Sequence, residues 1–147
     1  MVVVLGIDPG TAHTGYGVVL SHGRRLAALD GGVIATAPAE PLERRLARIH
    51  GRICDLVAAH RPAAMAAEDI LFGQNVRTAF VVGQARGAAV LSAGMAGVPC
   101  FSYTPQAVKQ AVCGSGRAEK GQVQRMVRVL LSLPEPPSPT TRPTPSP

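Results

Sequence analysis

One short segment near the start of the chain constrains the fold most strongly. Residues 2–7 are valine, leucine or isoleucine apart from one glycine, and the run stops at the Asp-Pro-Gly triplet of residues 8–10. Such a run predicts a buried strand that is followed by a turn. Residues 14–20 and 25–36 predict two further strands, with turn residues at 22–23 between them. Three consecutive strands with short connections predict an antiparallel meander.

Beyond the meander, the pattern alternates helices and strands. Residues 41–60 predict an amphipathic helix, because their apolar residues recur at spacings of three and four. Residues 63–71 predict a fourth strand, which is apolar as far as Glu68. The remaining predicted elements are a long apolar helix over 75–97, a strand over 98–104, a short helix from 105 and a helix over 118–131. This order predicts an α/β fold with one central sheet.

The size, composition and charge of the chain limit its class. Its 147 residues, 46% of them hydrophobic and 3% aromatic, suit one domain with an aliphatic core. The net charge of +6 favours a polyanionic partner such as nucleic acid, although a merely basic soluble protein would show the same excess. We expect no membrane-spanning segment, no signal peptide and a cytoplasmic location. Three cysteines share no metal-binding or disulfide spacing and are expected to be reduced thiols: Cys54, Cys100 and Cys113.

The last residues of the chain have a different composition. Seven of the 14 residues from Pro134 to Pro147 are proline, and none of them is a large apolar residue. Proline at this density is incompatible with a helix or a central strand. We therefore expect one folded domain over 1–133 and a disordered or frameshifted proline-rich tail over 134–147.

Two of the nine acidic residues occupy informative positions. Asp8 ends one apolar strand and Glu68 lies near the end of another. A carboxylate in such a place is costly unless it is paired or binds a cation, and two neighbouring carboxylates repel each other. A divalent metal such as Mg²⁺ removes that repulsion, because it prefers carboxylates, waters and phosphate oxygens as ligands. The alternatives are a turn-forming role for Asp8 and a surface role for Glu68.

Five short motifs, in order, resemble those of the RuvC family of Holliday-junction resolvases. They are LGIDPGTxxTGYG at 5–17, AxED at 66–69, GQARG at 83–87, VKQ at 108–110 and GRAEKxQV at 116–123. The resemblance implies an RNase H-like fold with a central mixed five-stranded sheet flanked by helices. It also implies a homodimer that cuts four-way DNA junctions in recombination and repair with Mg²⁺, for which Mn²⁺ can substitute. A junction-migrating helicase complex of the RuvA–RuvB type is the implied partner.

The resemblance also implies roles for individual residues. Asp8 and Glu68 are the implied metal ligands. The two lysines of the chain, Lys109 and Lys120, match basic positions near the active site, where they would neutralise charge on the scissile phosphate. The family often has an aromatic residue that stacks on a base shortly after the glutamate, but Leu71 stands there. Its neighbour Phe72 can take that role or belong to the core, and the further expected DNA contacts are Arg77, Arg86 and Arg117.

The family has two more carboxylates on a last helix of the type DxADALA, whereas this chain has no acidic residue after Glu135. Residues 139–147 can be encoded by codons that mostly have G or C at the third position. When the same nucleotides are read in a shifted frame, they encode DDAADALA. We therefore hypothesise a one-base insertion or deletion just before Pro139. A genuine proline-rich tail is the alternative. With two of four ligands, we expect the chain as written to be weakly active or inactive.

Three other classes share part of this pattern. Actin-like ATPases and sugar kinases open with a similar Asp-x-Gly-Thr turn, but they need two lobes and a much longer chain. YqgF-like RNA nucleases begin with GIDPGT but lack the motifs at 83–87 and 116–123. A junction-binding protein without catalysis would fit a genuine proline-rich tail. The helix over 75–97 is expected either to pair across a two-fold axis or to pack in the core, with Gly83 and Gly87 marking close packing.

Overall fold

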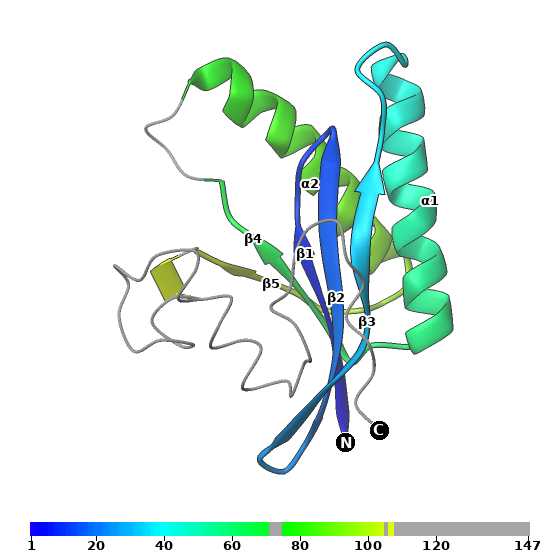
Figure 1. Cartoon of the computed structure of the whole chain (residues 1–147), viewed down its shortest axis with the longest axis vertical. Helices are drawn as coiled ribbons and strands as arrows, with labels where there is room; N and C mark the ends of the chain where they lie inside the picture. The colour runs from blue at the N-terminus through cyan, green and yellow to red at the C-terminus, as the bar shows by residue number, and fades with distance from the viewer. Residues whose placement is uncertain (71–74, 105, 108–147) are drawn as a thin grey trace.

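A computed structural model describes residues 1–70, 75–104 and 106–107. Seven elements lie in this part of the chain (Figure 1): β1 (Val2–Asp8), β2 (His13–His22), β3 (Arg25–Ala35), α1 (Leu42–His60), β4 (Ala64–Glu68), α2 (Val76–Met95) and β5 (Cys100–Tyr103). Several predictions fall outside the described residues: those for Leu71, Phe72, Lys109, Cys113, Arg117, Lys120, the helices expected after residue 105 and the tail from 134 to 147.

The strands form one mixed sheet in the order β3-β2-β1-β4-β5. β1, β2 and β3 pair antiparallel, which confirms the predicted meander. β4 pairs parallel with β1, and β5 pairs parallel with β4. α2 forms the crossover between β4 and β5, and α1 returns the chain from the end of the meander to β4 beside β1. The predicted five-stranded mixed sheet is confirmed.

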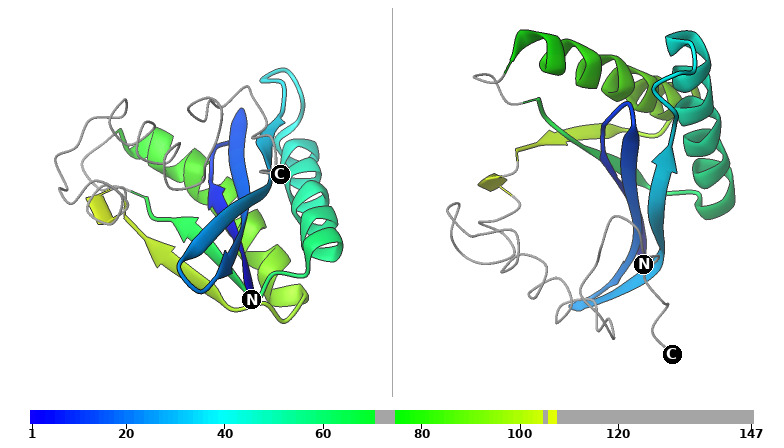
Figure 2. Two further views of the ribbon diagram at one scale, coloured as in Figure 1. Left: turned by 60° about the horizontal axis from the view of Figure 1, so that its bottom comes forward. Right: turned by 45° about the horizontal axis from the view of Figure 1, so that its top comes forward.

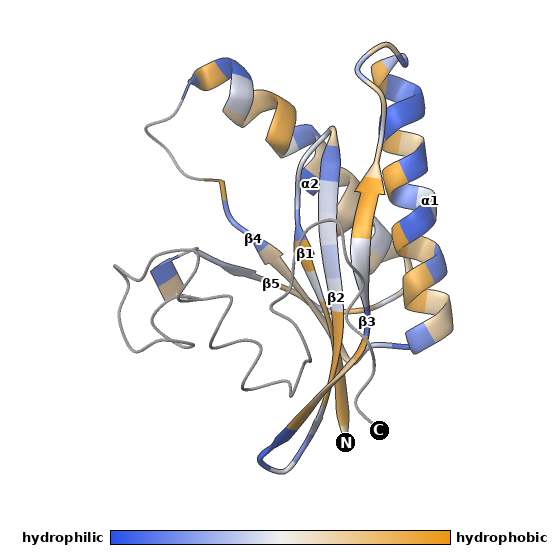
Figure 3. Cartoon of the chain, viewed as in Figure 1, coloured by the Kyte–Doolittle hydropathy of each residue, from blue (hydrophilic) through white to orange (hydrophobic). Residues whose placement is uncertain are grey.

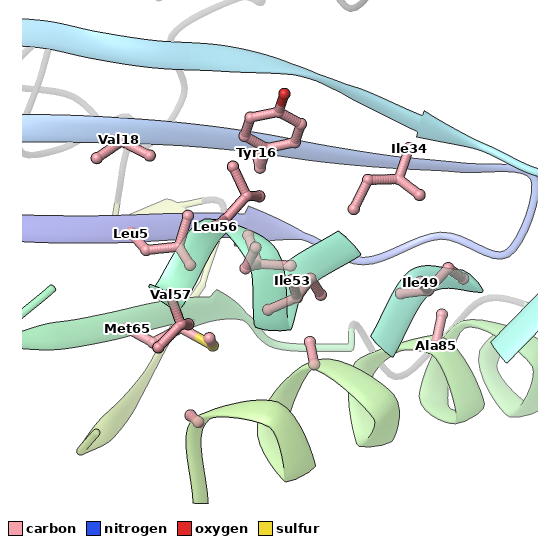
Figure 4. Close-up of a cluster of buried hydrophobic side chains, with 13 residues drawn as sticks. Leu5, Tyr16, Val18, Ile34, Ile49, Ile53, Leu56, Val57, Met65 and Ala85 are labelled. Atoms are coloured by element: carbon pink, nitrogen blue, oxygen red, sulfur yellow. The ribbon is translucent and has the colours of Figure 1, made fainter. Parts of the chain in front are cut away.

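Both helices cover the same face of the sheet, as two turned views make plain (Figure 2). Strand residues that alternate along the chain point toward this layer, and they form the core with apolar residues of both helices (Figure 4). The buried strand residues of this cluster are Leu5, Ile7, Tyr16, Val18, Ile34 and Met65. We call this side of the sheet the helix face. The opposite side, which carries Asp8 and Glu68, is the carboxylate face.

The two helices bury different kinds of side chain. α1 combines apolar and hydrophilic residues along its length (Figure 3), and its buried stripe is Ile49, Ile53, Leu56 and Val57. The predicted amphipathic helix is therefore confirmed. α2 buries Ala85, Ala89, Ser92 and Ala93, whose small size lets this helix lie close to its neighbours. No helix in the described part of the chain is long and apolar enough to cross a membrane.

The end of β4 differs from its prediction. The strand stops at Glu68 instead of continuing to residue 71. Ile70 leaves the sheet and contacts α2, where a Cβ on Gly83 would lie 3.2 Å from its Cδ1 atom. Close packing predicted at Gly83 is thus confirmed, whereas a Cβ on Gly87 would meet nothing within 4 Å. Strand propensity alone could not reveal that Ile70 packs against a helix instead of pairing in the sheet.

Candidate metal centre

Asp8 is presented by a tight turn between β1 and β2. The turn requires glycine at position 10, because a Cβ there would lie 2.4 Å from the carbonyl oxygen of His13. The Thr14 hydroxyl donates to the Gly10 carbonyl oxygen over 2.5 Å. Asp8 itself is exposed and lies opposite Gly15 in the β1–β2 pair. The Asp-Pro-Gly turn expected from the sequence therefore places a solvent-accessible carboxylate at the end of β1.

Buried hydroxyl groups fasten this turn to both helices. The Thr11 hydroxyl donates to the Val81 carbonyl oxygen of α2 over 3.1 Å. Thr36, just after β3, donates its hydroxyl to the Thr11 carbonyl oxygen over 2.5 Å, and its own oxygen accepts from Arg45 Nε of α1 over 2.9 Å. Thr11 and Thr36 are 6% and 7% exposed, so their polar groups depend on these partners. The turn that carries Asp8 is thereby anchored to the layer beneath it.

Asp8 and Glu68 lie at adjacent strand ends on the carboxylate face. β1 and β4 run parallel with Ile7 opposite Ala67, so the next residue of each strand is an acid. Side chains at matched positions of a parallel pair point to the same face. Small residues lie beside Asp8, since Gly6 and Gly15 belong to this face and a Cβ on Gly15 would lie 3.6 Å from Asp8 Cβ. The juxtaposition predicted from two strand ends is therefore present.

Tyr103 is a third member of this site that the sequence analysis did not identify. It pairs in register with Glu68, and its hydroxyl donates to the Ile7 carbonyl oxygen over 3.3 Å. Burial, followed by the negative charges of Glu68 and Asp8, raises the pKa of Tyr103 to about 12. The phenol therefore remains a neutral donor at physiological pH. The sequence predicted a strand over 98–104, but not its parallel pairing with β4 or the register that brings Tyr103 to Glu68.

Arg86 reaches the same strand ends from the helix face. Its Nε donates to the Glu68 carbonyl oxygen over 3.1 Å, and its Nη2 donates to the Ser102 hydroxyl over 2.5 Å. The Nη2 atom also lies 3.4 Å from Asp69 Oδ1. A guanidinium with three protein partners is well placed to position β4, so the DNA contact expected of Arg86 stays a prediction. Arg77, by contrast, is exposed in the first turn of α2.

The donor set around Asp8 suits a hard cation. Carboxylate oxygens at two adjacent strand ends, one exposed and one half-buried, are the ligands that Mg²⁺ prefers, and it keeps several waters as well. Within 1–70, 75–104 and 106–107, no group of three or more histidine, cysteine, aspartate or glutamate residues could hold a metal. Asp8 and Glu68 are the described residues that could hold a cation, which would stay open to water and phosphate.

A sheet in this order, with carboxylates at the adjacent ends of its first and fourth strands, defines an RNase H-like nuclease domain. The chain belongs to one family of that class, RuvC, whose family model is described as crossover junction endodeoxyribonuclease RuvC and matches residues 4–143. Members of this family are metal-dependent nucleases. The resemblance drawn from the five motifs is confirmed.

Individual relatives match most of the chain. The crossover junction endodeoxyribonuclease RuvC of Pelotomaculum thermopropionicum is 50% identical over 137 residues, which are 93% of this chain and 84% of the relative. The structure of T. thermophilus RuvC in complex with Holliday junction substrate is similar at a TM-score of 0.89 and 43% identity, over 95% of this chain and 85% of that one. A second Thermus thermophilus RuvC structure gives a TM-score of 0.86 at 44% identity, over 93% and 84%.

Proposed function

We propose that this chain is a structure-selective endonuclease that resolves four-way DNA junctions in recombination and repair. The observation that carries the proposal is the pair of carboxylates, Asp8 and Glu68, at the matched ends of two parallel strands. The similarity to T. thermophilus RuvC in complex with Holliday junction substrate supports the choice of DNA junction as substrate. The net charge of +6 supports a polyanionic substrate in general.

In this proposal Asp8 and Glu68 hold Mg²⁺, for which Mn²⁺ can substitute. The cation supplies Lewis-acid activation of the scissile phosphate and of a water molecule. Asp8 and Glu68 bring the negative charge that retains it, and the anchored turn at Gly10 and Thr11 keeps Asp8 at the strand end. The small residues of the carboxylate face leave room for a phosphate group beside the acids. An RNA nuclease of the YqgF type, and a junction-binding protein without catalysis, are the alternatives.

The proposed DNA contacts combine backbone neutralisation and base stacking. Lys109 and Lys120 neutralise the scissile phosphate or the charge that develops on it. Leu71 or its neighbour Phe72 lies against an unpaired base of the junction. Exposed Arg77 contacts the DNA backbone beside the site. Arg86 and Arg117 complete the proposed basic set.

We also propose that the enzyme acts as a homodimer through α2. The outer side of this helix exposes Phe80, Leu91 and Met95 at 67%, 55% and 69%. Gly87 lies between Phe80 and Leu91 on that side, is exposed and has open space at its Cβ position, so a second backbone can approach closely. A two-fold dimer suits a four-way junction, which presents two equivalent sites for cleavage. A helicase complex of the RuvA–RuvB type remains the proposed partner, and the cytoplasm the proposed location.

The C-terminal residues affect whether this chain can cleave a DNA junction. We propose that residues 139–147 are the out-of-frame product of a segment that encodes DDAADALA, whose acids complete the metal-binding set. The chain as written is then expected to bind junctions and to cut them slowly or not at all. Sequencing of the gene tests this directly: if no reading frame near residue 139 encodes DDAADALA, the hypothesis is wrong and the proline-rich tail is genuine.

Two carboxylate variants test the proposed function. We expect Asp8→Asn and Glu68→Gln to retain affinity for a four-way junction without metal and to lose at least about 100-fold in cleavage rate in Mg²⁺, since each removes one metal ligand. The measurement is single-turnover cleavage of a labelled four-way junction, made both with this chain and with a variant in which DDAADALA replaces residues 139–147. Asp55→Asn is the matched control, because Asp55 is an exposed acid of α1 on the other layer.

The same assay separates the alternatives. In the form that carries DDAADALA at residues 139–147, cleavage by the Asp8→Asn variant at the rate of the Asp55→Asn control would overturn the proposed metal centre. Preferential cleavage of RNA would favour the RNA nuclease class. ATP binding without junction binding would favour the actin-like class. Junction binding with no cleavage by either form of the C-terminal segment would favour a binding protein.

A further inference from the structure

The side chain of Tyr103 connects two strands that are not neighbours in the sheet. Among the described strands, β5 pairs with β4, and β1 lies on the other side of β4. The hydroxyl of Tyr103 nevertheless reaches the Ile7 carbonyl oxygen, over 3.3 Å. Its ring therefore crosses β4 on the carboxylate face, at the position where Glu68 is its register partner. The contact is made one residue before Asp8.

The backbone at this point holds Tyr103 and Glu68 firmly. Asp69 donates its backbone N–H to the Tyr103 carbonyl oxygen over 2.7 Å, which joins the ends of β4 and β5. On the helix face, Arg86 Nε donates to the Glu68 carbonyl oxygen over 3.1 Å. The end of β4 is thus fixed to β5 and to α2. The hydroxyl of Tyr103 extends this fixed unit across β4 to the end of β1.

We propose that Tyr103 is a positioning residue that fixes Asp8 relative to Glu68 and thereby sets the affinity of the site for a divalent cation. The proposal rests on the proposed metal centre, and it adds a role for a residue outside the ligand set. Loss of the hydroxyl leaves the Ile7 carbonyl oxygen without this donor and lets the end of β1 move relative to β4. Two carboxylates that are held less firmly bind a cation more weakly, because the site must be ordered when the cation binds.

Tyr103→Phe tests this role, with Tyr16→Phe as the matched control. These are the two tyrosines of the chain. Tyr16 is buried on the helix face, where its hydroxyl lies 2.9 Å from the position of a Cβ on Gly32. We expect Tyr103→Phe to bind Mn²⁺ about two- to tenfold more weakly, the range set by the loss of one hydrogen bond. Electron paramagnetic resonance of free Mn²⁺ measures this affinity without recourse to cleavage.

A second measurement keeps the proposal separate from the metal centre itself. In hydrogen–deuterium exchange on metal-free protein, we expect peptides that cover residues 5–12 to exchange faster in Tyr103→Phe than in wild type or in Tyr16→Phe. Unchanged exchange together with unchanged Mn²⁺ affinity would overturn the role of Tyr103. Both variants could instead lose thermal stability and metal-free junction binding equally while their Mn²⁺ affinity stays that of wild type. That result would mean that Tyr103 contributes to packing and does not position Asp8. If neither wild type nor the variant that carries DDAADALA at residues 139–147 binds Mn²⁺, the proposed metal centre falls, and the exchange rates still decide whether Tyr103 restrains β1.

Discussion

At the scale of single residues, the ends of β1 and β4 are held by groups that carry no catalytic chemistry of their own. Gly10 permits the turn after Asp8, and the Thr11 hydroxyl ties that turn to α2. Arg86 holds the end of β4 from the helix face, and the Tyr103 hydroxyl contacts the end of β1 from the carboxylate face. Precise placement of carboxylates requires such support, because a ligand that is free to move must be ordered when its metal binds.

Gly10 is the residue whose replacement should disturb Asp8 most directly. In Gly10→Ala the new Cβ meets the His13 carbonyl oxygen at 2.4 Å, and since that atom is backbone the turn must open. We expect the free energy of unfolding to fall by about 1–3 kcal/mol, as measured by urea denaturation. Gly17→Ala in β2 is the control, because a Cβ there meets nothing within 4 Å. Equal unfolding free energies for the two variants would contradict this account of the turn.

At the scale of elements, α2 has three roles, each on a different part of its surface. Its alanine-rich side packs on the core, and Gly83 accommodates Ile70 where the chain leaves β4. Arg86, which extends from the same helix, contacts the ends of both β4 and β5. Its outer side exposes large apolar residues, which include Phe80 and Leu91. One helix therefore serves the core, the positioning of Glu68 and the proposed dimer contact.

Arg86 can position β4 or contact DNA, and salt dependence separates these roles. We expect Arg86→Met to lower the free energy of unfolding by about 1–3 kcal/mol, since the Glu68 carbonyl oxygen loses a charged donor. The slope of the logarithm of junction affinity against the logarithm of salt concentration should stay the same. Arg77→Met, at an exposed site, should reduce that slope by about one, which corresponds to one phosphate contact. A reduced slope for Arg86→Met would instead support the DNA contact that its motif predicted.

At the scale of the whole molecule, stability and chemistry lie on different faces of one sheet. The aliphatic core fills the space between the helix face and the two helices (Figure 4). The carboxylate face carries Asp8, Glu68 and Tyr103, with Gly6 and Gly15 beside Asp8. Substitutions at the carboxylates can therefore change function with little loss of core packing.

The proposed dimer is also a property of the whole molecule. We expect Leu91→Glu to shift the protein toward monomers, because Leu91 is 55% exposed on the outer side of α2 and a charge there opposes apolar contact between copies. Sedimentation equilibrium measures the change in association. Leu26→Glu is the matched control, since Leu26 is a 39% exposed leucine of β3. Monomers with both variants, or unchanged association of Leu91→Glu, would place the interface elsewhere.

Local sequence was sufficient wherever the determining interaction is local. The run before Asp8, the alternation along the strands and the stripe of α1 predicted the elements because burial imposes their periodicity on neighbouring residues. Asp8 and Glu68 were identifiable as candidates because a carboxylate at the end of an apolar strand is visible in the sequence itself. The motifs were sufficient to indicate the RuvC family.

Only the tertiary structure decided which distant groups meet. The parallel register between β4 and β5 places Tyr103 beside Glu68, and no local pattern specifies that register. The packing of α2 on the sheet places Arg86 beside the Glu68 carbonyl oxygen. Ile70, which follows the end of β4, leaves the sheet and contacts Gly83 of the same helix. Sequence alone therefore indicated the seven described elements, the family and the two acids. The arrangement that holds those acids was decided by contacts between residues far apart in the chain, because such contacts depend on how whole elements pack.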